Sequence, residues 1–323
     1  MDTISKISTS PFAWVAKIFK EWITTDRDMA AAVAAVKALT EVIKVSKAYT
    51  MMELEREIRA ASEILKSCST ALSVASGCEL FTRILVKTAS DVPDIVECKK
   101  RLIETGESYA KQSVVSRQKI GQLADEFIRD GVTVLTHGFS RVVMTVLLNA
   151  VNRGKRFSVI VTEARPDDIG YITAKTLQES KVPVKIVMDS AVAYIMDKVD
   201  LVLVGAEGIV ESGGIINKIG TYQISIIASA FKRPFYVAAE SFKFMRLYPL
   251  SQSDVNDMGM LLGGSNTAQQ ANKKADANTS LQQVNVDTHG HDYTPPSYIT
   301  LLFTELGVLT PAAVSDELIK LYY

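Results

Sequence analysis

Residues 132–163 read VTVLTHGFSRVVMTVLLNAVNRGKRFSVIVTE, and this stretch decides the fold that we expect. Two short apolar runs rich in β-branched residues, 132–137 and 157–163, flank a segment with the apolar spacing of a helix. Strand, helix and strand in this order are the unit of a parallel sheet. The stretch therefore predicts an α/β domain.

The same alternation continues towards the carboxyl terminus. Further apolar runs occupy 182–189, 201–207 and 235–240, and helix-like segments such as 168–180 separate such runs. Because the runs are almost continuously apolar, they are typical of strands covered on both faces. We predict a Rossmann-like doubly wound parallel sheet in residues 130–323, with any ligand at the carboxyl ends of the strands.

The residues before the sheet have a different pattern. From about Asp26 to Arg129, apolar residues recur at spacings of three and four. We expect helices over 29–45, 51–67, 76–90 and 94–129, and hence an N-terminal helical bundle in residues 1–129.

A polar stretch interrupts the carboxyl-terminal half. Residues 251–293 are rich in Asn, Gln, Ser, Asp and Gly, and we interpret them as a mobile insertion. After them we expect a helix over 297–309, ending near Gly307, and another over 311–322.

Composition excludes several classes of protein. Lys plus Arg and Asp plus Glu both total 36 in 323 residues, so the formal net charge is zero, which disfavours a general nucleic-acid binder. No uncharged apolar run reaches 18 residues, so no membrane span is expected. The three Cys fit neither a CxxC zinc site nor a disulfide framework, and we expect a cytosolic protein without a metal site or a cofactor.

The first two predicted strands end in polar residues. Ser140 and Arg141 follow strand one and open a helix, where free N–H groups favour an anion; Ser140 could equally be a helix cap and Arg141 a surface residue. His137 has no nucleophile motif beside it, so we expect it to orient the following turn. Glu163 and Arg165 follow strand two and could pair with each other or face the same crevice.

A glycine-rich segment follows strand four. It fits neither GxGxxG nor the P-loop pattern, but Glu207, Asn217, Lys218 and Thr221 accompany its glycines and suit a phosphate ligand. The sequence His289-Gly-His291 is a weak metal pattern, and we interpret it as part of a solvated loop.

These motifs are similar to one known family. The segments LTHGFSRVV (135–143), FSVIVTEARP (157–166), LVLVGAEGIVESGGIINKIGTY (201–222), RPFYVAAESFKF (233–244) and DYTPPSYITLLFTELGVLTPAAVSDELIKLY (292–322) resemble the alpha-subunit family of eukaryotic translation initiation factor 2B. The likeness runs from about Met29 to the carboxyl terminus and fades in the polar insertion.

The wider superfamily includes methylthioribose-1-phosphate and ribose-1,5-bisphosphate isomerases. In those enzymes a catalytic cysteine follows Leu-Thr-His and a catalytic aspartate follows Gly-Ala, whereas this chain has Gly138 and Glu207 there. The sugar-phosphate motif Asn-Lys-Ile-Gly-Thr is intact at 217–221. The resemblance thus implies a binding pocket without the chemistry, and a sugar-phosphate isomerase is the alternative.

The resemblance also implies partners. We expect a homodimer that joins the beta, gamma, delta and epsilon subunits of the exchange factor, with nucleotide exchange belonging to epsilon. Together with beta and delta, the chain would recognise the phosphorylated alpha subunit of initiation factor 2. The pocket, formed by nine residues, would hold a sugar phosphate or a nucleotide monophosphate. These residues are His137, Ser140, Arg141, Glu163, Arg165, Glu207, Asn217, Lys218 and Thr221.

Overall fold

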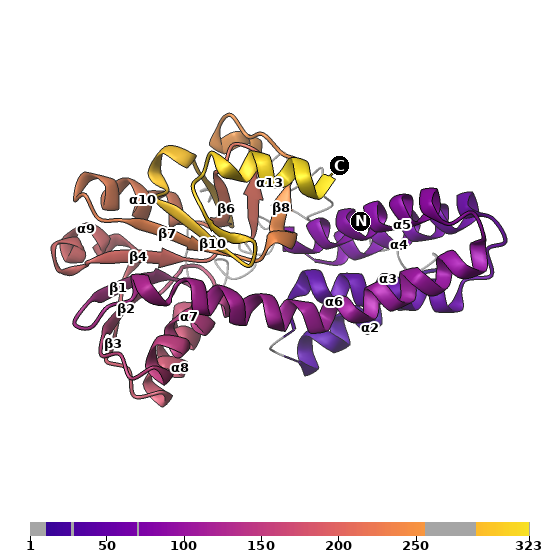
Figure 1. Cartoon of the computed structure of the whole chain (residues 1–323). Helices are drawn as coiled ribbons and strands as arrows, with labels where there is room; N and C mark the ends of the chain where they lie inside the picture. Colours follow the sequence, from indigo (N-terminus) through magenta and orange to yellow (C-terminus); the bar gives the residue numbers. More distant parts are fainter. Residues whose placement is uncertain (1–10, 27–28, 70, 256–288, 323) are drawn as a thin grey trace, which may run out of the picture. The chain divides into compact units, whose positions relative to one another are not determined.

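The computed structural model describes residues 11–26, 29–69, 71–255 and 289–322 (Figure 1). The chain divides into two compact units, one ending at Val114 and the other beginning at Val115. This division lies within helix α6 (Ile95–Leu123), earlier in the sequence than the boundary at 129/130 that we expected. The change of sequence pattern near residue 130 corresponds to the approach of the first strand, β1 (Thr133–His137).

The first unit is helical, as its periodicity predicts. Its described helices are α2 (Ala13–Thr25), α3 (Ala31–Val45), α4 (Met51–Cys68), α5 (Leu72–Asp91) and the first part of α6. Helix α2 precedes the stretch in which the sequence pattern predicts helices. Among the described helices, none combines the length with the hydrophobicity that a membrane span requires.

Helix α3 lies at the centre of this unit. Most of its side chains are buried, and they are mainly Ala and Val. Small side chains let neighbouring helices approach closely: a Cβ atom on Gly77 of α5 would lie 2.7 Å from the carbonyl oxygen of Ala32. The Ala-rich sequence therefore sets both the helical propensity and the packing distance.

The second unit contains a seven-stranded sheet in the order β11-β10-β7-β4-β1-β2-β3. All neighbours pair in parallel except β10 and β11. The remaining strands are β2 (Ser158–Thr162), β3 (Val184–Val187), β4 (Leu201–Val204), β7 (Phe235–Ala238), β10 (Leu301–Thr304) and β11 (Gly307–Leu309). The five strands predicted from apolar runs are confirmed.

Helices cover both faces of this sheet (Figure 1). One face packs against α7 (Arg141–Asn152) and α8 (Gly170–Glu179). The other packs against α9 (Val192–Ile195), α10 (Thr221–Ala230) and α13 (Ala313–Tyr322). This is the doubly wound architecture that the sequence predicts.

One predicted helix is wrong. Residues 297–309 form a short 3-10 turn followed by β10 and β11, not a helix. Leu302 and Phe303 are fully buried because β10 pairs with β7 inside the sheet. A short apolar run has the same composition in a buried helix and in a buried strand, so the pattern alone did not separate them. The helix predicted over 311–322 is confirmed as α13.

A second, four-stranded sheet has the order β8-β5-β6-β9. Its strands are β5 (Gly208–Val210), β6 (Ile215–Lys218), β8 (Phe244–Met245) and β9 (His291–Thr294). Strand β9 belongs to the stretch 251–293 that we interpreted as a mobile insertion, and this part of the interpretation is wrong because β9 pairs with β6. Residues 256–288 lie outside the described residues.

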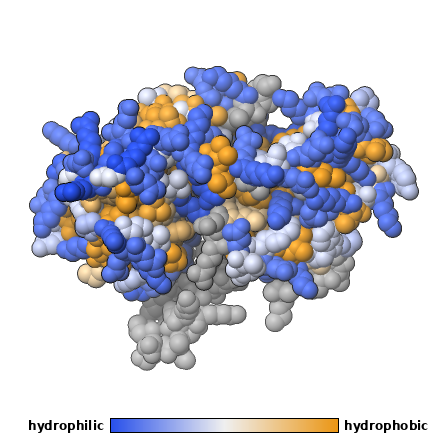
Figure 2. Space-filling model, turned by 60° about the horizontal axis from the view of Figure 1, so that its bottom comes forward, coloured by the Kyte–Doolittle hydropathy of each residue, from blue (hydrophilic) through white to orange (hydrophobic). Residues whose placement is uncertain are grey.

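Apolar side chains also reach the surface. Figure 2 shows patches of them among hydrophilic residues on the face that it presents. In the second unit, Tyr194 is 83% exposed, Met188 61% and Ile226 41%. The side-chain amide of Gln223 donates to the carbonyl oxygen of Asp189, so α10, which carries Ile226, contacts the segment that begins after Met188. We call Met188, Tyr194 and Ile226 the apolar patch.

Candidate functional site

His137 is the last residue of β1 and is almost fully buried. Its Nε2 lies 2.8 Å from the carbonyl oxygen of Ile219, and its Nδ1 lies 2.6 Å from the hydroxyl of Thr162. A carbonyl only accepts, so we assign the proton to Nε2, and Nδ1 then accepts from Thr162. Burial lowers the pKa of His137 despite the nearby carboxylate of Asp189. The ring is a neutral structural link to the turn before α10.

Gly138 follows with a left-handed backbone, φ +65°. Its carbonyl oxygen accepts a hydrogen bond of 2.6 Å from the hydroxyl of Thr173 on α8. Residues with side chains rarely adopt this conformation, so glycine suits this turn. The position offers a backbone carbonyl and no side chain for chemistry.

Ser140 and Arg141 begin α7. The Ser140 hydroxyl accepts from the backbone N–H of Val143 at 3.4 Å, which is the geometry of a weak helix cap. Arg141 is half-buried at the first helical position. Ser140 therefore caps α7, and its contact with a ligand stays a prediction.

Glu163 and Arg165 lie together after β2. The Arg165 Nε lies 3.5 Å from Glu163 Oε2 and 3.2 Å from Asp168 Oδ1. The backbone N–H of Arg165 donates to Asp189 Oδ2 at 2.8 Å, so Asp189 fixes this loop. The Arg165 side chain is 63% exposed, and its guanidinium is paired but accessible.

Glu207 follows β4 and lies among cations. Its Oε2 is 3.0 Å from His291 Nε2, and its Oε1 is 3.8 Å from Lys218 Nζ. The contact with His291 has ion-pair distance without the alignment of a hydrogen bond. Burial on its own would raise the pKa of Glu207, but His291, Lys218 and Lys243 outweigh it and bring the pKa to about 2. The carboxylate is therefore ionised, and its contacts with His291 and Lys218 fix its position.

Lys218 ends β6 beside two carboxylates. Its Nζ lies 3.1 Å from Asp167 Oδ2 as well as 3.8 Å from Glu207. Burial lowers the pKa of Lys218, yet Glu207 and Asp167 more than compensate, so the net shift is upward. The ammonium group stays charged, and its charge is balanced within the protein.

Asn217 and Thr221 build the turn between β6 and α10. The amide nitrogen of Asn217 donates to the Thr221 hydroxyl at 3.1 Å, and that hydroxyl donates to the carbonyl oxygen of Lys218 at 2.7 Å. Both side chains are buried. Their described hydrogen bonds shape the Asn-Lys-Ile-Gly-Thr turn from within.

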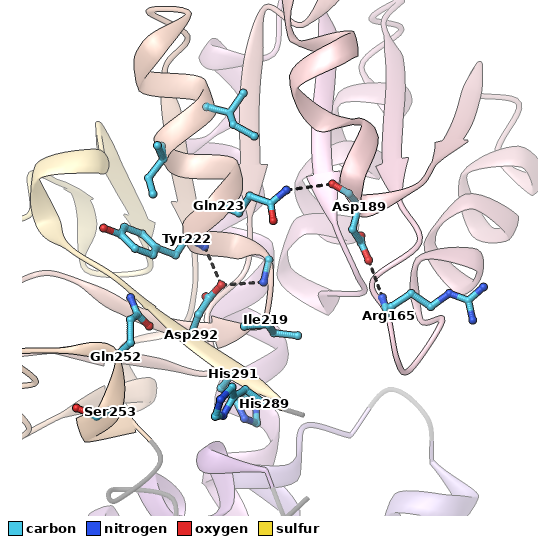
Figure 3. A pocket seen from close by; sticks show the side chains of 13 residues that line it. Arg165, Asp189, Ile219, Tyr222, Gln223, Gln252, Ser253, His289, His291 and Asp292 are labelled. Carbon is cyan, nitrogen blue, oxygen red and sulfur yellow. Dashed lines mark hydrogen bonds between the residues drawn. The ribbon is translucent and has the colours of Figure 1, made fainter. Parts of the chain in front are cut away.

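A pocket of about 710 Å³ lies beside this turn (Figure 3). Apolar residues of α10 and of the turn before it, Ile219, Ile226 and Ile227, line the pocket together with Arg165 and Asp189. Of the nine residues predicted for the site, only Arg165 lines this pocket. The others lie at the strand ends and in the turn.

Asp292 was missed by the sequence interpretation. It lines the pocket, and its Oδ2 accepts from the backbone N–H groups of Gly220 and Tyr222 at 2.7 and 3.0 Å (Figure 3). The neighbouring His291, which we placed in a solvated loop, instead contacts Glu207 and is mostly buried. The polar stretch gave no signal for either residue, because their places depend on β9 pairing with β6.

Three further charged residues were also missed. Asp189 ended a predicted strand, so its position at the sheet edge could have been recognised. Asp167 contacts Lys218 from the loop after β2, and Lys243 pairs with the buried Glu240 at 3.0 Å. Among the residues that the structure describes, no group of His, Cys, Asp and Glu has the arrangement of a metal site.

The chain is similar to known proteins over most of its length. The model of the "Initiation factor 2 subunit family" matches residues 24–311. The chain is 54% identical over 316 residues to translation initiation factor eIF2B subunit alpha of Dictyostelium discoideum, covering 96% of this chain and 97% of that protein.

Enzymes are also similar to the chain. It is 33% identical over 280 residues to ribose 1,5-bisphosphate isomerase of Methanocaldococcus jannaschii, covering 86% of this chain and 85% of the enzyme. Among solved structures, a chain of the tetrameric eIF2B-beta2-delta2 complex of C. thermophilum has a TM-score of 0.76 at 18% identity, covering 99% of this chain and 98% of that chain. This last likeness concerns the fold alone.

Proposed function

Because the chain belongs to the initiation factor 2 subunit family, we propose that it is a non-catalytic regulatory subunit of the guanine-nucleotide exchange factor for initiation factor 2. The 54% identity to an alpha subunit supports a role as a subunit of a translation initiation factor. We further propose that the chain is cytosolic and that it belongs to a complex in which the epsilon subunit performs nucleotide exchange.

The proposal that the chain is not an enzyme rests on the ionised carboxylate of Glu207 and on the absence of a side chain at Gly138. An isomerisation of a sugar phosphate needs groups that give and take protons at neighbouring carbons. Gly138 has no side chain, and a carboxyl group with a pKa of about 2 is a poor proton carrier near neutral pH. His137 has both ring nitrogens in hydrogen bonds. These residues are suited to support a turn.

A sugar-phosphate isomerase is the second candidate, favoured by the 33% identity to the archaeal enzyme. It would have to use Glu207 with a partner other than a thiol at position 138. Conversion of ribose 1,5-bisphosphate by the purified chain, lost in Glu207→Gln, would establish this candidate. We expect no conversion.

We propose that the site still binds a phosphorylated ligand, although it lacks the catalytic residues of the isomerases. Lys218 and Arg165 bring positive charge to the strand ends, as recognition of a phosphate requires, and His291 lies beside Glu207. Each already contacts a carboxylate, so a ligand phosphate would compete with Glu207, Asp167 or Glu163. A sugar phosphate or a nucleotide monophosphate would therefore act as a bound ligand that is not converted.

Assembly is the central test of the proposal. We propose that the second unit forms a homodimer, that the dimer joins the beta, gamma, delta and epsilon subunits, and that the helical unit contributes to recognition of phosphorylated factor 2 alpha. The tagged chain should capture the other four subunits, and the assembled complex should bind phosphorylated factor 2 more tightly than the unphosphorylated form. Failure to capture any subunit would contradict the assignment.

A further inference from the structure

The Asn-Lys-Ile-Gly-Thr turn leads into the amino terminus of α10, where we expect a phosphate to bind. A carboxylate of the protein already occupies this helix terminus. Oδ2 of Asp292 accepts from the N–H of Gly220 at 2.7 Å and from the N–H of Tyr222 at 3.0 Å (Figure 3). Gly220 precedes the helix with φ +103°, and the helix has no cap from its own first residues. The cap comes from β9, 72 residues along the chain.

Asp292 is itself incompletely satisfied. The residue is 5% exposed, and its Oδ1 has no hydrogen-bond partner among the described residues. Burial raises the pKa of Asp292 to about 7, although the N–H groups of Tyr222 and Gly220 and the neighbouring His291 favour its ionised form. This carboxylate therefore gains and loses its proton near neutral pH.

Other titratable or charged groups surround the α10 terminus. They come from β1 (His137), the loop after β2 (Arg165 and Asp167), the turn after β3 (Asp189), the end of β4 (Glu207), β6 (Lys218), β9 and its preceding residues (His289 and His291), and α10 itself (Tyr222). An experiment that assigns a pH dependence of ligand binding to Asp292 must therefore distinguish protonation of Asp292 from protonation of the nearby histidines.

We propose that Asp292 is an internal anion that occupies the amino terminus of α10 in place of a ligand phosphate, and that proton uptake by Asp292 opens this terminus to an external oxyanion. The proposal rests on the phosphate-binding role proposed above. Two anions cannot share the same two N–H donors without strong repulsion, whereas a neutral carboxyl group repels no oxyanion and accepts more weakly. Lys218 would then serve a ligand at the same turn.

Inorganic sulfate is the suitable probe, because its charge does not change between pH 6 and pH 8. If only the protonated form of Asp292 admits the anion, a pKa of about 7 predicts that sulfate binds the wild-type chain about tenfold more tightly at pH 6 than at pH 8. Asp292→Asn should bind sulfate with the pH 6 affinity at both pH values. Titration calorimetry on the full chain measures these affinities.

The matched control is Asp189→Asn. Asp189 lines the same pocket and also accepts two backbone N–H groups, from Ala164 and Arg165, but it does not cap α10. This variant should keep the tenfold pH dependence. His291→Gln should keep tighter binding at pH 6 than at pH 8, by a smaller factor, because His291 favours the ionised form of Asp292 and its loss raises the pKa of Asp292. If Asp292→Asn keeps the pH dependence, or if His291→Gln loses it, the proposal is overturned in favour of histidine protonation.

Lys218→Ala separates this proposal from the ligand site on which it rests. Loss of sulfate binding in this variant at both pH values supports the ligand site. Sulfate binding that depends on Lys218 but is equal at pH 6 and pH 8 would overturn the role of Asp292 and leave the ligand site standing. No sulfate binding by any of the variants or the wild type would overturn both. If Asp292→Asn fails to fold, the sulfate affinities of the wild-type chain and of His291→Gln at pH 6 and pH 8 still distinguish protonation of Asp292 from protonation of His291.

Discussion

At the scale of single residues, the ion-pair partners of Glu207 give this carboxylate a structural role in place of a catalytic one. A carboxylate at the end of a strand in an open α/β sheet is well placed for catalysis. Here His291 and Lys218 lie within 3.0 and 3.8 Å of it, and Asp167 shares the same lysine. The group therefore stabilises the meeting point of β4, β6 and β9.

We predict that Glu207→Gln destabilises the protein by about 3 kcal/mol at pH 7, since the pKa of Glu207 falls from an ordinary 4.5 to about 2 on folding. A lowered pKa means that the folded state holds the proton less tightly. The stabilisation is thus fully present above pH 4.5 and is lost as the pH falls towards 2. Urea unfolding of both proteins at pH 7 and pH 3 should show the difference shrinking at the lower pH.

Glu317→Gln is the control for this experiment. Glu317 forms an ion pair of 2.7 Å with Lys320 along α13, and the lysine is largely exposed. Such pairs contribute roughly 0.5 kcal/mol or less. An equal loss in Glu207→Gln and Glu317→Gln would show that the buried cluster contributes nothing special.

At the scale of elements, close helix packing in the first unit depends on glycine. A Cβ atom on Gly77 would lie 2.7 Å from a backbone oxygen of α3, and backbone cannot move aside as a flexible side chain can. We predict that Gly77→Ala destabilises the protein by about 1–3 kcal/mol, the usual cost of overpacking. Thermal unfolding followed by circular dichroism measures this loss.

Gly121 of α6 offers the matched substitution. A Cβ there would meet the side chain of Thr145 at 3.3 Å, a contact that a small adjustment relieves. Alanine is also the better helix former by about 1 kcal/mol, so Gly121→Ala should be neutral or stabilising. Destabilisation of both variants to the same degree would mean that backbone contact is not what selects glycine at position 77.

At the scale of the whole molecule, the apolar patch is the feature to connect with assembly. Tyr194 and Met188 expose large apolar surfaces on the unit that we propose to dimerise. We predict that the purified chain sediments as a dimer at micromolar concentration and that Tyr194→Lys shifts it towards monomer, because a charge buried at an interface is costly. Analytical ultracentrifugation gives the masses.

Tyr248→Lys is the corresponding control, since Tyr248 is 62% exposed in the segment after β8, outside the apolar patch. It should leave the dimer intact. A monomeric wild-type chain, or a dimer unaffected by Tyr194→Lys, would contradict this location of the interface.

The sequence by itself determined the two kinds of architecture and the five strands with continuous apolar runs, which are β1, β2, β3, β4 and β7. It also determined the strand ends at which the charged residues gather. These follow from local periodicity, which neighbouring residues set. Only the tertiary structure decided that 301–304 is a strand and that His291 and Asp292 reach Glu207 and α10. Those outcomes depend on pairing between segments about 70 residues apart, and no local pattern reports which partner a strand will meet.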